Sequence, residues 1–285
     1  MKRPLSFACA IIGFRYGSAF LSTPPHLPST RFDNEVRYRI HRSPSRSLEL
    51  LHLSKNLQND EPLEVVSSED AYFNVKNLVP LIGGQSILIV ASIGIAKVLH
   101  VDNFGLGPDF LLDSSSLQSG AVATLPLIGL AFVLDKFEKN VPALMEVSRA
   151  TQRSVLSMLG EKRKPLIALL ASMGLGIAAG VGEEMLFRGI LQGELVSKVG
   201  DAVALGSSAI VFGALHAVTP LYAILASVAS LYFGELYLSS HNLAVPIVCH
   251  SVYDVWALLS AHWAITAMTD EERTLIANWE PSRTE

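Results

Sequence analysis

Apolar runs close to membrane-spanning length occupy most of the chain after residue 76. A helix needs ~20 apolar residues to cross the hydrocarbon core of a bilayer. Only 17% of the 285 residues are charged, whereas a soluble domain carries roughly 25%. We therefore predict an all-α, polytopic transmembrane helix bundle with about six spans. The expected helices cover residues 77–99, 120–134, 165–199, 202–218, 221–238 and 243–265.

The composition excludes several other classes of protein. The net charge is −4, and no basic face with interleaved aromatic residues is present, so we expect no nucleic-acid partner. There are only 2 cysteines, Cys9 and Cys249. They lie in a predicted targeting segment and in an apolar run, and this placement argues against a disulfide framework.

The first 76 residues differ in composition from the rest of the chain. Residues 1–20 have a basic start, a short apolar stretch and small residues at their end, as in a signal peptide. Residues 21–55 are rich in Ser, Pro and Arg and poor in acids, as in a transit peptide. Residues 56–76 form an acidic linker. We expect this presequence to be disordered.

A signal peptide followed by a transit-like tract resembles the bipartite plastid presequences of algae with secondary plastids. This resemblance favours a plastid membrane. The alternative is a disordered N-terminal arm on a protein of the endoplasmic reticulum or another endomembrane. The expected domain order after the presequence is a transmembrane domain at 77–265 and a polar C-terminal tail at 266–285.

Two features of the predicted spans bear on their arrangement. Residues 165–199 would form a helix of about 52 Å, which exceeds a ~30 Å hydrocarbon core, so this element must tilt, bend or project. The segment 135–164 carries seven Lys/Arg against four Asp/Glu, which favours the cytosol or its plastid equivalent. Its middle, 141–159, is amphipathic enough to lie at the membrane interface, and a solvated connector is the alternative.

Three polar clusters interrupt the apolar runs in the second half of the chain. A charged side chain at the bilayer centre costs about 2.5–3.5 kcal/mol on insertion scales. Such residues usually face the protein interior and pair with one another, so we predict that these clusters converge on one cavity. They are Glu183, Glu184 and Arg188, then Phe212 and His216, then His250 and Asp254.

Each cluster also has a purely structural interpretation. Glu184 and Arg188 lie four residues apart and could form a structural ion pair. His216 could be a hydrogen-bonded core histidine, and His250 and Asp254 a hydrogen-bonded pair one helical turn apart. Glu235 is a further intramembrane acid without an assigned role. The other histidines lie in the presequence or near predicted span ends: His26, His41, His52, His100, His241 and His262.

The three clusters resemble the motifs of the CAAX protease and bacteriocin-processing family, or type II CAAX prenyl endopeptidase-like proteins. EEMLFR at 183–188 is similar to its E-E-x-x-x-R motif. FGALH at 212–216 is similar to F-x-x-x-H, and HSVYD at 250–254 is similar to H-x-x-x-N/D. The order and spacing agree across residues 165–260. The resemblance implies an intramembrane endopeptidase of the glutamate type.

The resemblance also implies roles for individual residues. Glu183 would be the general base that takes a proton from the attacking water, helped by His216. Glu184 and Arg188 would hold the surrounding groups in place. His250, together with residue 254, would bind the developing oxyanion. No cofactor is expected for this mechanism.

Asp254 departs from the Asn that the best-characterised prenyl proteases carry at this position. An ionised Asp only accepts hydrogen bonds, so it cannot donate one to an oxyanion. It could instead orient His250, or it could be a metal ligand. A zinc-dependent protease is therefore an alternative, with ligands from His216, His250 and a carboxylate of Glu184 or Asp254.

A non-catalytic membrane scaffold or chaperone of the same fold is the alternative outside the enzymes. For an enzyme, the expected partners are the lipid bilayer and a membrane-associated protein or peptide substrate. The sequence leaves open whether that substrate is prenylated.

Overall fold

The computed structural model describes residues 75–281, and within this range the chain is helical and contains no strand. This confirms the predicted all-α fold. The predicted signal peptide-like segment (1–20), the transit-like segment (21–55), nearly all of the linker (56–76) and residues 282–285 of the tail lie outside the described residues.

Five helical elements are long and apolar enough to cross a membrane, which makes this a multi-pass membrane protein. Three are the helices α2 (Val75–Leu99), α3 (Ser114–Phe137) and α8 (Pro220–Ser240). A fourth is α9 (Ala244–Thr266). The remaining one is continuous from Pro165 to Val199 and is divided into α5 (Pro165–Glu184), η4 (Met185–Gln192) and α6 (Gly193–Val199).

The helix predicted at 202–218 is shorter than a span. It is α7 (Asp201–Leu215), and its 15 residues extend about 22 Å, less than the ~30 Å hydrocarbon core. The chain turns at His216, whose N–H bonds the carbonyls of Phe212 and Gly213, and α8 starts soon after at Pro220. His216 therefore stands at a helix end rather than in mid-span.

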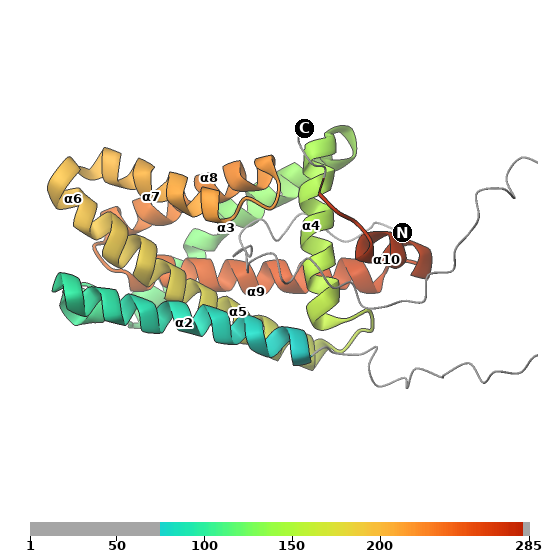
Figure 1. Cartoon of the computed structure of the whole chain (residues 1–285), viewed down its shortest axis with the longest axis horizontal. Coiled ribbons are helices and arrows are strands. Elements are labelled where there is room, and N and C mark those ends of the chain that lie inside the picture. Colours follow the sequence, from blue (N-terminus) through green and yellow to red (C-terminus); the bar gives the residue numbers. More distant parts are fainter. Residues whose placement is uncertain (1–74, 282–285) are drawn as a thin grey trace, which may run out of the picture.

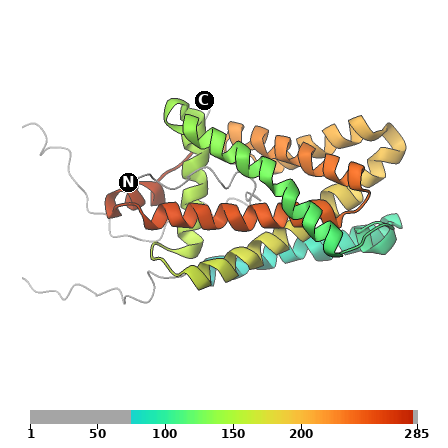
Figure 2. The same cartoon turned by 180° about the vertical axis from the view of Figure 1, so that it is seen from behind.

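The helices α2, α5 and α9 run along the long axis of the molecule, and α7 lies beside α8 (Figure 1). From behind, α3 slants across α9 (Figure 2). The best-buried span is α9, which packs against α5, α3, α4 and α8. The exposed apolar side chains of α2 and α3, such as Val90 and Leu125, are suited to contact with lipid.

The amphipathic segment predicted at 141–159 is the helix α4 (Pro142–Leu159), which crosses one end of the bundle (Figure 1). Its first residue is proline, which is favourable at this position, and it ends before Gly160, whose φ is 71°. It buries Val147, Val155 and Met158 against neighbouring helices. The segment is therefore a packed helix, and its place at the membrane interface stays a prediction.

Two further helix starts follow local hydrogen bonding. Asp113 caps α3 by accepting from the Ser116 N–H, and this bond holds the pKa of the Asp113 carboxyl below its usual range. At α10 (Asp270–Ala277), inside the predicted polar tail, Thr269 and Glu272 form a capping box, in which each side chain accepts from the backbone N–H of the other residue. The short 3₁₀ segments η2 (Asp102–Gly105) and η3 (Glu138–Asn140) lie in the connections on either side of α3.

Candidate active site

The two adjacent carboxylates end α5, at the point where the chain changes helical type. After Glu184 the segment η4 is a π-helix. This form is rare in proteins, and where it occurs it is often at a functional site. The Ser208 hydroxyl of α7 donates to the Phe187 carbonyl of this segment at 3.1 Å. The long predicted helix therefore departs from α-geometry after Glu183 and Glu184, and its glycines at 174–182 lie within the regular α5.

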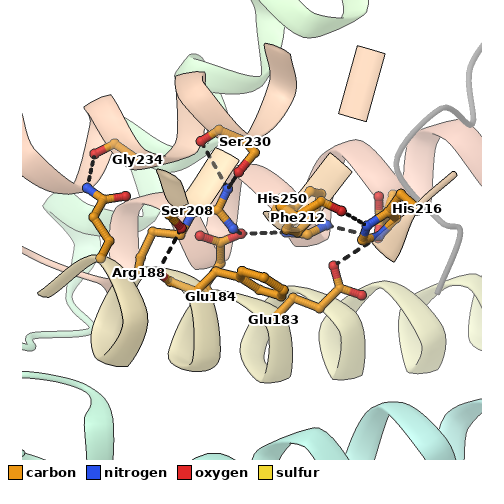
Figure 3. A network of polar contacts seen from close by, with 12 residues as sticks. Glu183, Glu184, Arg188, Ser208, Phe212, His216, Ser230, Gly234 and His250 are labelled. Atoms are coloured by element: carbon orange, nitrogen blue, oxygen red, sulfur yellow. Dashed lines mark hydrogen bonds and ion pairs between the residues drawn. The ribbon is translucent and has the colours of Figure 1, made fainter. Parts of the chain in front are cut away.

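Glu184 is at the centre of a connected set of buried side chains (Figure 3). Its Oε1 accepts from Arg188 Nη1 at 3.0 Å and from His250 Nδ1 at 2.7 Å. The predicted pairing of Glu184 with Arg188 is thus confirmed. Since His250 comes from α9, the Glu184 carboxylate links α5 to α9, the two helices that are in most extensive contact.

The guanidinium of Arg188 is fully buried and is held from α8. Nη2 donates to both the carbonyl, at 3.0 Å, and the hydroxyl, at 2.8 Å, of Ser230. The rings of Phe212 and Phe233 have their centroids 4.9 and 5.3 Å from its central carbon. A buried cation needs such an enclosure, because removing any partner leaves an uncompensated charge.

Glu183 faces a different partner from its neighbour. Its Oε2 lies 3.6 Å from His216 Nε2, slightly beyond a direct hydrogen bond (Figure 3). His216 Nδ1 donates to the Phe212 carbonyl at 2.7 Å, and its ring stacks on Phe212 with centroids 4.1 Å apart. In the neutral ring Nε2 is then an acceptor, so a group that donates between the two could bridge it to Glu183.

His250 has a carboxylate at each ring nitrogen. Glu184 bonds Nδ1, and Asp254 Oδ2 lies 3.5 Å from Nε2, which confirms the predicted proximity of His250 and Asp254. The imidazole also stacks on Phe233, with centroids 4.6 Å apart and planes inclined by 12°. The ring is thus fixed in both its plane and its rotation. Both nitrogens donate together only when the ring is an imidazolium.

The structure therefore brings together the six ionisable residues that the sequence singled out for chemistry. They come from α5, η4, the end of α7 and α9, and each is at most 1% exposed. Glu235 does not join them, because its side chain is exposed on α8. His262, which lies near a predicted span end, is buried at 3% exposure, because α9 is covered by α4 and other helices.

Two contributors from α8 are not predicted by the sequence motifs. Ser230 holds Arg188, and Phe233 stacks on His250. Neither residue type stands out in an apolar span, since serine is small and phenylalanine is common there. The available signal was their spacing, because Ser230 lies three residues before Phe233 and both face the site from one side of a helix.

The ligand set of the zinc alternative is present but not arranged for a metal. Within residues 75–281, no group of three or more His, Cys, Asp or Glu side chains is placed to hold a metal ion. His216 turns Nε2 toward Glu183, whereas His250 Nδ1 bonds Glu184 and its Nε2 faces Asp254 at 3.5 Å. The donor atoms therefore point to separate partners and do not fit a common ion.

Comparison with known proteins relates the second half of the chain to a family of proteases. Residues 165–266 match the family model described as type II CAAX prenyl endopeptidase Rce1-like. No curated protein and no solved structure matches the chain. The matched segment runs from α5 to the end of α9 and contains every site residue named above. It confirms the resemblance of the three motifs, and it supports peptidase activity in general.

Proposed function

We propose that this protein is an intramembrane endopeptidase of the CAAX-processing type that hydrolyses a peptide bond with a water activated by Glu183. The observation that carries this proposal is the buried pair of Glu183 and His216, 3.6 Å apart. Both atoms accept hydrogen bonds, so one water beside the pair can donate one proton to each of them. A general base must reach the proton that it removes, directly or through one water.

The two adjacent carboxylates differ in a way that supports this division of roles. Glu184 Oε1 is already bonded to both Arg188 and His250, so this residue is held as part of a fixed assembly. Glu183 instead faces Nε2 of His216, which is an acceptor when the ring is neutral. Because the two atoms are 3.6 Å apart, Oε2 of Glu183 can still accept a hydrogen bond from a donor such as water. Glu183 is therefore the better candidate to accept a proton from water.

The proposed reaction balances without a further reactant. Water attacks the carbonyl carbon of the scissile bond while Glu183 takes its proton. His250, as an imidazolium held at Nδ1 by Glu184, donates a hydrogen bond from Nε2 to the tetrahedral oxyanion, since Nε2 lies 3.5 Å from Asp254 and is not hydrogen-bonded to it. The carbon–nitrogen bond then breaks, and the proton on Glu183 passes to the leaving amine. The products are a new carboxylic acid and a free amine, which become a carboxylate and an ammonium group when the remaining acid proton passes to the amine.

The substrate proposed from the family match is a membrane-associated polypeptide with a prenylated cysteine near its C-terminus. The test uses the full chain in liposomes with a farnesylated peptide ending in a CAAX sequence, and the matching peptide without the farnesyl group. Mass spectrometry should detect the released tripeptide from the farnesylated peptide. Cleavage of both peptides at equal rates would contradict the prenyl requirement, and cleavage of neither would favour the non-catalytic scaffold.

We also propose that the presequence directs the protein to a plastid membrane. The test is a fusion of residues 1–76 to a fluorescent protein, expressed in an alga with a secondary plastid. Plastid fluorescence supports this location, and fluorescence confined to the endoplasmic reticulum supports the endomembrane alternative.

A further inference from the structure

A line of hydrogen bonds crosses three helices in the buried interior (Figure 3). It starts at Ser230 on α8, whose hydroxyl accepts from Arg188 Nη2 at 2.8 Å. It continues from Arg188 to Glu184 at 3.0 Å and from Glu184 to His250 at 2.7 Å. Every side chain in this line is at most 1% exposed, so water does not compete for these bonds.

Ser230 holds the guanidinium with two oxygens. Its carbonyl and its hydroxyl both accept from Nη2 of Arg188, whereas Nη1 serves Glu184. The guanidinium is a rigid planar fork, so fixing one arm sets the direction of the other. The hydroxyl is the side-chain half of this anchor, so it contributes to the direction in which the guanidinium meets Glu184.

We infer that Ser230 is a positioning residue for the catalytic histidine. By fixing Arg188 it places Glu184, and through Glu184 it sets the rotation of the His250 ring. The consequence for catalysis rests on the proposed function, since it concerns the group assigned to the oxyanion. The consequence for the His250 ring holds for the folded protein whether or not a substrate is cut.

A second contact between the same elements shows what distinguishes Ser230. Gln192, one turn after Arg188, donates to the Gly234 carbonyl on α8 at 3.1 Å and is also fully buried. Both contacts join η4 to α8. The contact at Ser230 continues through Arg188 and Glu184 to the histidine, whereas the amide nitrogen of Gln192 serves the α8 backbone.

The first measurement follows the imidazole directly. The full chain is labelled with [¹⁵N]histidine in detergent micelles, and the His250 ring signals are assigned by their loss in His250→Gln. Ser230→Ala should shift the His250 ring nitrogens and leave those of His262 unchanged. His262 is a suitable internal reference because it is buried on the same helix, about 18 Å further along.

Ser227→Ala is the matched control variant, since the Ser227 hydroxyl donates to the Ala223 carbonyl of its own helix. It should leave the His250 signals in place. Unchanged His250 signals in Ser230→Ala would overturn the inference. Equal shifts of His250 and His262 would also overturn it, because they would mean a general loosening of the bundle.

The second measurement is kinetic and uses the farnesylated CAAX peptide. Ser230→Ala should lower kcat about tenfold, consistent with loss of a hydrogen bond to a charged group, with KM within about twofold of the wild type. Gln192→Met should leave kcat within about twofold. Equal losses of kcat in both variants would contradict a specific role for Ser230. If the wild type cuts no peptide, the proposed function fails, and the histidine signals still decide the inference.

Discussion

The α5 element and the N-terminal spans α2 and α3 are similar in hydropathy, and α9 is less apolar than all three, yet α5 and α9 bury more of their surface. In the apolar windows of these helices, 67% of α9 and 44% of the α5 element are buried, against 22% for each of α2 and α3. Glycines of α5 and α2 differ in the same way. A Cβ at Gly180 would lie 3.0 Å from the Ser251 nitrogen, whereas a Cβ at Gly94 would meet nothing within 4 Å.

This comparison teaches that hydropathy identifies membrane helices without locating their functional part. The same small residue permits close backbone approach in one helix pair and faces open space in another. The acids and histidines of the site occur beside the closely packed α5–α9 contact. Variants of α5 and α2 can test whether the close α5–α9 contact and the chemistry depend on each other.

The largest effect is expected from Glu183→Gln, which keeps the shape of the side chain and removes the base. Because general-base catalysis contributes about 10²–10⁴-fold, kcat for the farnesylated peptide should fall by that factor. The matched control is Glu235→Gln, which removes an exposed carboxylate on α8 and should leave kcat within about twofold. A normal rate in Glu183→Gln would exclude the glutamate mechanism.

The next largest effect concerns the close contact itself. Gly180→Ala should destabilise the protein by about 1–3 kcal/mol, because the methyl group meets the Ser251 backbone and side chain and the Ile247 carbonyl. Gly94→Ala, in the open face of α2, should be neutral or slightly stabilising, because alanine is the better helix former. Thermal unfolding of both variants in the same detergent provides the measurement.

Equal stability of the two glycine variants would contradict the difference between the regions. It would mean that α5 and α9 are not held at the distance that the structure shows.

A smaller effect is expected from the aromatic residue under His250. Phe233→Leu removes the stacked ring, and a loss of about 0.5–1.5 kcal/mol corresponds to a roughly two- to tenfold lower kcat. Phe132→Leu is the control, because Phe132 is an exposed ring on α3 that contacts Trp256. A similar loss in both variants would show that general packing, and not the stack on His250, sets the rate.

The smallest effect is expected from metal removal. Prolonged incubation with a chelator should change cleavage of the peptide by less than about twofold, because the donor atoms of His216 and His250 point to separate partners. Loss of activity that zinc restores would favour the metalloprotease alternative. The glutamate mechanism would then need replacement.

The sequence by itself determined the fold class, and it singled out the ionisable residues of the candidate site. Runs of apolar residues are sufficient to predict membrane helices, since a bilayer imposes both their length and their hydrogen bonding. Charged residues within such runs are costly, and this cost alone identified Glu183, Glu184 and Arg188 as candidates for chemistry. The spacing within each motif also predicted the Glu184–Arg188 and His250–Asp254 pairs, because residues four apart share a helix face.

Only the tertiary structure decided how separate helices meet. It showed that the adjacent glutamates face different histidines, that α7 stops short of a full span at His216, and that α8 supplies Ser230 and Phe233. None of these follows from local periodicity, because each depends on which helices are neighbours and how closely their backbones approach. The spacing of Ser230 and Phe233 puts them on one helix face, but only packing places them against Arg188 and His250.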